Sequence, residues 1–148
     1  MSNENEVTPE FLATFTQAWN DKDLDKLMEH MADECEFMAS VGADKEGTHW
    51  KGREEVRKGF ASLWEGYPDA HFEPVGEDFI IGDRGCSEWI FTGTKKADGS
   101  KVEARGCDVY TFKDGKLAVK NSMRKQKPCS GRDERAISEQ EVKYETPR

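Results

Sequence analysis

The sequence predicts an α+β domain: three N-terminal helices packed on one face of a strongly curved, antiparallel or mixed β-sheet. Two observations support this fold class. Apolar residues recur at helical spacing through much of residues 8–66, whereas residues 70–126 contain alternating strand patterns separated by turn residues. Helices that precede a run of strands are typical of α+β domains. A bent sheet covered by helices forms a cone with an interior pocket.

Three apolar stripes predict the helices. The first helix begins at Thr8-Pro9, because Thr is a good N-cap and Pro suits the first helical position. Its stripe is Phe11, Phe15 and Trp19. The stripes of the second and third helices are Leu24, Leu27, Met28 and Met31, and then Val56, Phe60, Leu63 and Trp64, with Gly66 as the helix stop.

Alternation and turn residues predict the strands. A short strand is expected at 34–39, followed by a loop at 41–47. The remaining strands are expected at 71–81, with a break at Pro74 and Gly76, and at 86–94, 102–112 and 117–126. Asp98-Gly99 and Asp114-Gly115 predict two-residue hairpin loops, which would determine the pairing of the last three strands.

Length and charge limit the possible functions. A chain of 148 residues fits one domain. We expect a disordered leader at 1–7, the domain at 8–126 and a charged tail at 127–148. The formal net charge of -8 argues against binding to nucleic acid or to anionic membranes. No segment is long and apolar enough to span a bilayer.

Cysteine and histidine usage predicts a reduced protein without a metal site. The four cysteines form no CxxC motif, and the polar, acidic N-terminus lacks the pattern of a signal peptide. The three histidines show no metal-ligand spacing. We therefore expect cytoplasmic location, reduced thiols and no cofactor.

Three segments of the chain carry a family resemblance, which covers about residues 8–126. They are Phe15-Thr16-Gln17-Ala18-Trp19-Asn20 with Asp23-Leu24-Asp25, then Gly52-Arg53-Glu54-Glu55-Val56, and Gly106-Cys107-Asp108-Val109-Tyr110-Thr111-Phe112-Lys113-Asp114-Gly115-Lys116-Leu117. In order and spacing, the chain resembles the NTF2-like superfamily, in particular its SnoaL-like branch, which includes ketosteroid isomerases and polyketide cyclases. The resemblance implies the cone-shaped fold, but this fold hosts many activities and also proteins without catalysis.

The residues of ketosteroid isomerase are only partly present. That enzyme combines an Asp base with an oxyanion hole made of a Tyr and a protonated Asp. The resemblance places the oxyanion Asp on Asp108, the Tyr on Phe15 and the base on Ala39. Two of the three roles are therefore missing, and the sequence predicts that this chain is not a steroid isomerase of that type.

The two hairpin loops predict which residues surround Asp108. With two-residue loops, Asp108 lies opposite Trp89 on one side and Asn121 on the other. By alternation, the same face carries Phe91, Tyr110, Phe112, Val119 and Met123. An aromatic face with one carboxyl and one amide has the composition of a small-molecule pocket.

This arrangement makes Asp108 the first candidate for chemistry. A carboxyl buried against aromatic rings loses hydration, which favours its neutral form and allows it to act as a general acid. Asn121 would orient it or bind a substrate carbonyl. The alternative is a structural Asp108 that is hydrogen-bonded to Asn121 and Tyr110.

Further site candidates lie nearer the N-terminus. The resemblance implies that His49-Trp50 lies near the pocket mouth, so that His49 is a candidate base; the alternative is an exposed loop histidine. We expect Phe15, Trp19, Trp50, Trp89, Phe91, Tyr110 and Met123 to contact the ligand. Phe15 and Trp19 are also expected in the core.

Two functions remain open. The first is a cofactor-free isomerase, dehydratase or cyclase that acts on a small carbonyl compound through Asp108. The second is a module without catalysis, which either binds a metabolite or serves as a dimeric interaction module. The outer sheet face is half apolar and half charged, which suits a two-fold homodimer, and the resemblance favours this dimer over the alternative of a solvated face. Its residues would be Glu88, Ile90, Thr92, Arg105, Val109, Thr111, Lys120, Ser122 and Arg124.

Overall fold

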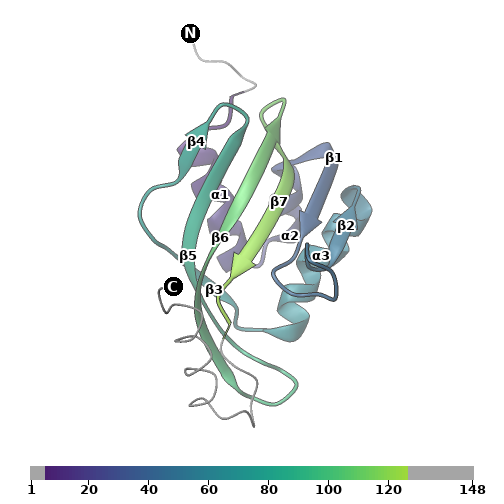
Figure 1. Ribbon diagram of the computed structural model, residues 1–148, viewed down its shortest axis with the longest axis vertical. Coiled ribbons are helices and arrows are strands. Elements are labelled where there is room, and N and C mark those ends of the chain that lie inside the picture. Colours follow the sequence, from purple (N-terminus) through teal and green to yellow (C-terminus); the bar gives the residue numbers. More distant parts are fainter. Residues whose placement is uncertain (1–5, 127–148) are drawn as a thin grey trace, which may run out of the picture.

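A computed structural model, which describes residues 6–126, confirms the α+β class: three helices lie against one side of a curved sheet that does not close (Figure 1). The helices are α1 (Pro9–Asn20), α2 (Leu24–Glu29) and α3 (Arg53–Gly66). The strands are β1 (Met31–Met38), β2 (His49–Lys51), β3 (His71–Pro74), β4 (Phe79–Ile81), β5 (Arg84–Thr94), β6 (Lys101–Lys113) and β7 (Lys116–Arg124).

The ends of the predicted domain organisation are only partly described. Residues 1–5 of the predicted leader and the predicted tail at 127–148 lie outside the described residues. Val7, which the leader was expected to include, is buried in the hydrophobic core. The ordered part of the domain therefore begins before the Thr8 N-cap, whose side chain accepts a hydrogen bond from the Phe11 amide.

The sheet is mixed, with the order β2-β1-β7-β6-β5-β3, and β4 also pairs with β5. Strand β1 is parallel to β7, and the other pairs are antiparallel. Two local predictions were wrong. Met31 belongs to β1, where it pairs with Leu117, and not to α2. Residues 49–51, expected in a loop, form the edge strand β2 against β1.

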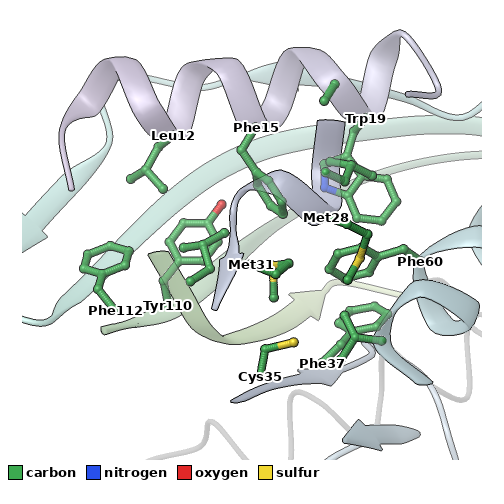
Figure 2. Close-up of a cluster of buried hydrophobic side chains, with 14 of the residues drawn as sticks. Leu12, Phe15, Trp19, Met28, Met31, Cys35, Phe37, Phe60, Tyr110 and Phe112 are labelled. Atoms are coloured by element: carbon green, nitrogen blue, oxygen red, sulfur yellow. The ribbon is translucent and has the colours of Figure 1, made fainter. Parts of the chain in front are cut away.

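The core fills the space between α1, α3 and the concave face of the sheet (Figure 2). Phe15 and Trp19 of α1 lie on the stripe that the sequence predicted, and Phe60 of α3 packs 4.9 Å from Trp19 between ring centroids. Tyr110 and Phe112 extend the cluster from β6. Figure 2 shows Trp19, Phe60 and Phe37 at one end of this core and Tyr110 and Phe112 at the other.

Two polar side chains tie the helices to the sheet. The Asn20 amide donates to the Phe72 carbonyl at 2.9 Å and accepts from the Phe72 amide at 2.8 Å, which joins the end of α1 to β3. The Arg53 guanidinium donates to the carbonyls of Met31 at 2.7 Å and Met28 at 3.0 Å. These bonds fix the positions of α1 and α3 over the sheet.

The hairpin between β5 and β6 differs from the prediction in its loop. The strands pair up to Thr94 and Lys101, so that residues 95–100 form the connection in place of a two-residue turn at Asp98-Gly99. Asp108 therefore lies opposite Ser87, and Trp89 lies opposite Gly106. Because this shift is an even number of residues, Trp89 and Asp108 still share the concave face.

The hairpin between β6 and β7 has the predicted tight turn but a different register beyond it. Lys113 pairs with Lys116 around Asp114-Gly115, and the register then shifts between Thr111 and Phe112. This irregularity places Asp108 opposite Ser122, not Asn121. A shift by one residue moves every following side chain to the other face of the sheet. The assignment of Lys120, Ser122 and Arg124 to the outer face was therefore wrong.

Candidate functional site

Asp108 lies at the centre of a buried polar cluster. Its Oδ2 accepts a hydrogen bond from the Trp89 indole Nε1 at 3.1 Å. Its Oδ1 accepts from Lys120 Nζ at 3.0 Å and from Ser122 Oγ at 2.5 Å. Since burying a charge is costly unless it is paired and hydrogen-bonded, these three donors stabilise the carboxylate. Asp108 is thus the ion-pair partner of Lys120, and its hydrogen-bond partners are not Asn121 and Tyr110, which the structural alternative had predicted.

Lys120 is the second charge of this cluster. It is 4 % exposed, compared with 5 % for Asp108. Nζ also lies 5.0 Å from the ring centroid of Trp19, 4.8 Å from that of Phe37 and 5.9 Å from that of Phe60, within the range of cation–π attraction. An ammonium has three N–H donors, and the described residues accept two of them, at Asp108 and Ser122.

A cavity of about 210 Å³ lies beside Lys120, between α3 and the sheet. Most of its wall is apolar. Its lining residues are Trp19, Phe37, Ala39, Ser40, Val41, Thr48, Trp50, Gly59, Ser62, Leu63, Gly66, Tyr67, Phe72, Trp89, Phe91, Lys120, Ser122 and Arg124. Asp108 is not among them, whereas its three hydrogen-bond donors Trp89, Lys120 and Ser122 are.

Two glycines make room for aromatic rings of the wall. A Cβ on Gly106 would lie 2.5 Å from the Trp89 ring and 2.4 Å from the Met123 carbonyl oxygen. A Cβ on Gly59 of α3 would lie 2.5 Å from the Trp50 ring, which stacks on Phe37 with centroids 5.2 Å apart. Glycine at these positions therefore allows the rings to pack directly on the backbone.

The predicted ligand contacts fall into three groups. Trp19, Trp50, Trp89 and Phe91 line the cavity. Phe15 and Tyr110 are core residues that do not reach it. Met123 is 47 % exposed on the outer side of β7, because the register shift turns the residues that follow it to the opposite face of the sheet. It lines an outer, open groove of about 720 Å³ and not the cavity.

The two other predicted catalytic residues lie outside the cavity. Asn121 pairs in the sheet with Val109 and Met38, and lines the outer groove. The expected row of Trp89, Asp108 and Asn121 is therefore wrong. His49 belongs to the edge strand β2, and its Nε2 lies 3.0 Å from the carboxylate of Glu36 in β1. His49 does not line the cavity.

Sequence reasoning missed Lys120, Ser122 and Arg124 as cavity residues. They alternate along β7, so all three face the concave side once the register shift is known. One signal was available. A buried carboxylate at Asp108 needs a cationic partner, and the neighbouring strand carries a lysine and an arginine four residues apart, hence on one face.

A second group of buried polar atoms lies near Asp108. The Tyr110 hydroxyl and the Ser87 hydroxyl are buried with no hydrogen-bond partner among the described residues. Burial, together with the nearby Asp108 carboxylate, raises the pKa of Tyr110 well above its ordinary value, so its hydroxyl stays protonated. Burial also raises the pKa of Asp78 beside Ser87.

Residues 6–126 contain no cluster of three His, Cys, Asp or Glu side chains arranged to hold a metal ion. None of their three helices has the length and apolar character needed to cross a bilayer.

Comparison with known proteins identifies the family. The model of the SnoaL-like domain matches residues 12–120. No curated protein matches the chain in sequence. The fold is similar to that of Bal32a from a soil-derived mobile gene cassette, at 19 % identity and a TM-score of 0.70, covering 82 % of this chain and 92 % of that one.

Two further solved structures are named as candidate polyketide cyclases. The one from Xanthomonas campestris pv. campestris is 14 % identical, with a TM-score of 0.66 over 77 % of this chain and 87 % of that one. The one from Acidithiobacillus ferrooxidans is 22 % identical, with a TM-score of 0.65 over 85 % and 92 %. At these identities the likeness establishes the NTF2-like fold.

Proposed function

Because the chain belongs to the SnoaL-like domain family, whose members bind small molecules, we propose that its aromatic cavity binds a small carbonyl compound and that Lys120 polarises the carbonyl group. The single observation that carries this proposal is the buried Lys120 ammonium in the cavity wall, held by Asp108 and Ser122 with one N–H donor left over. Trp19 supports it, because its buried indole N–H also lacks an acceptor among residues 6–126.

The geometry suits chemistry at the carbon next to a carbonyl group. A hydrogen bond from Lys120 Nζ stabilises the negative charge that develops on the carbonyl oxygen when this carbon loses a proton. The electron pair of the C–H bond moves toward the oxygen, and the proton passes to water at the open end. Isomerisation, dehydration and cyclisation all begin in this way without a cofactor. In this scheme Asp108 is a positioning residue that holds Lys120.

A binding protein without turnover is the second candidate. The lining residues include no Asp, Glu or His, so the described cavity wall supplies no ordinary general base. Rings and donors around a carbonyl group are sufficient for recognition alone. The same cavity would then hold a metabolite through Lys120 and its aromatic walls.

One experiment separates the two candidates. We would incubate the protein with 2-tetralone in deuterated water, follow exchange of the protons next to its ketone by NMR, and measure the melting temperature with and without the compound. Enzymatic function predicts faster exchange that is lost in Lys120→Met and kept in Lys113→Met, a change at an exposed lysine of β6. Stabilisation without exchange supports the binding protein, and the absence of both contradicts the proposed function.

The assembly and the location of the protein stay predictions. With the corrected register, the outer sheet face carries Val109, Val119 and Met123 beside charged residues, which supports a two-fold dimer through this face. The cytoplasmic location depends on the sequence pattern alone.

A further inference from the structure

The charges of the cavity wall are both positive. Among the lining residues only Lys120 and Arg124 carry a formal charge. Lys120 is paired with Asp108, whereas no carboxylate of residues 6–126 forms a salt bridge with Arg124. The described cavity thus has one uncompensated positive charge in a chain whose net charge is -8.

Arg124 is held in a defined position by aromatic rings. Its guanidinium carbon lies 4.8 Å from the ring centroid of Phe91 and 5.8 Å from that of Tyr67. Stacking on rings covers the face of a guanidinium and leaves its N–H edge available for an acceptor. Its Nε is buried and has no acceptor among the described residues.

Arg124 stands where the cavity meets the outer groove. Five residues line both spaces: Ala39, Ser40, Val41, Ser122 and Arg124. Lys120, by contrast, lines only the inner cavity. Arg124 lies four residues beyond Lys120, about 13 Å further along β7. Both side chains line the same cavity, so they can contact two different groups of one ligand.

We propose that the ligand is a small aromatic keto acid, whose carboxylate pairs with Arg124 at the mouth and whose ring and ketone lie inward, toward Trp89 and Lys120. This inference rests on the proposed function and adds the charge of the ligand. A guanidinium matches a carboxylate through two parallel hydrogen bonds, which a stacked and partly buried arginine can form with little loss of side-chain freedom. The cavity of about 210 Å³ is smaller than a site for a drug-sized molecule, which fits a ligand with one or two rings.

The test compares three probes that share a phenyl ketone: 3-benzoylpropionate, its primary amide and its methyl ester. Binding is followed by tryptophan fluorescence, because Trp19, Trp50 and Trp89 line the cavity. The acid should bind roughly tenfold more tightly than the amide, and only the binding of the acid should weaken with added salt.

Variants locate the effect. Arg124→Gln should weaken binding of the acid by about tenfold and leave binding of the amide unchanged. Arg105→Gln, which removes the same charge from an exposed position on the outer side of β6, should change neither. Arg124→Lys keeps the charge but loses the planar fork, so it should bind the acid with intermediate affinity and serve if Arg124→Gln folds poorly.

Three results would overturn the inference: equal affinity for acid and amide, equal losses in Arg124→Gln and Arg105→Gln, or no binding of any probe at millimolar concentration. Its failure is distinguishable from failure of the proposed function. If 2-tetralone binds in a Lys120-dependent manner while the acid has no advantage, the carbonyl site stands and the anion site does not.

Discussion

Lys120 and Asp108 form an ion pair in which Nζ lies 3.0 Å from Oδ1, and both side chains are more than nine-tenths buried. Removing one partner of such a pair leaves a buried, uncompensated charge, which typically costs about 3–5 kcal/mol. We expect Asp108→Asn to lower the free energy of unfolding by about this amount. The double variant Asp108→Asn/Lys120→Met should lose less than the sum of the two single variants, as measured by urea denaturation. Additive losses would contradict the pairing.

The contact between Gly106 and Trp89 makes a second prediction. Gly106→Ala forces a methyl group against the Trp89 ring and the Met123 carbonyl, so the free energy of unfolding should fall by about 1–3 kcal/mol. Tryptophan fluorescence should also change, since the ring must move. Gly66→Ala is the matched control, because its Cβ would meet no atom within 4 Å. If the two variants lose the same stability, close packing at Gly106 is not the cause.

His30 predicts how stability depends on pH. Burial lowers its pKa below the ordinary value of 6.5, while Nδ1 contacts the Lys26 carbonyl and the ring packs against Phe11 and Phe15. Between its folded pKa and 6.5 the unfolded chain binds more protons than the folded chain, so stability falls as pH falls through this window. Denaturation at pH 7.5 and pH 5.5 should show this loss, and His30→Phe should reduce it. His71→Phe, at an exposed histidine, serves as the control.

The predicted dimer can be tested at Met123, whose side chain is exposed on the outer side of β7. Met123→Glu places a charge in this face, and light scattering should then show the mass of a monomer where the unaltered protein shows that of a dimer. Ala43→Glu adds the same charge in the exposed loop before β2 and should keep the dimer. A monomeric unaltered protein would refute the prediction.

Much of the architecture could be predicted from local patterns, because each helix stripe and most strands are encoded by nearby residues. The stripe of Phe11, Phe15 and Trp19 and the tight turn at Asp114-Gly115 are examples. The edge strand β2 could not be predicted in this way, since its three residues are too few to show an alternation and form a strand only by pairing with β1.

The site was harder to predict than the fold, because it depends on the register of two hairpins. An error of two residues between β5 and β6 left Trp89 and Asp108 on one face, so this part of the prediction was robust. The irregularity in β7 moved the residues that follow it to the opposite face of the sheet. Nothing in the alternation of Leu117, Val119 and Met123 indicates this irregularity. The alternation of apolar residues therefore favoured the wrong face, and Lys120 was assigned to the outer face that was predicted to form the dimer.

The parallel pairing of β1 with β7 has a consequence for the order of folding. Phe37 and Lys120 are register partners in this pair, although they come from opposite ends of the domain. Joining such distant segments carries a large loop-closure entropy, and parallel pairs are slow to form. During synthesis, the cavity cannot be completed until β7 has left the ribosome. We therefore expect the binding site to be among the last parts of the molecule to become ordered.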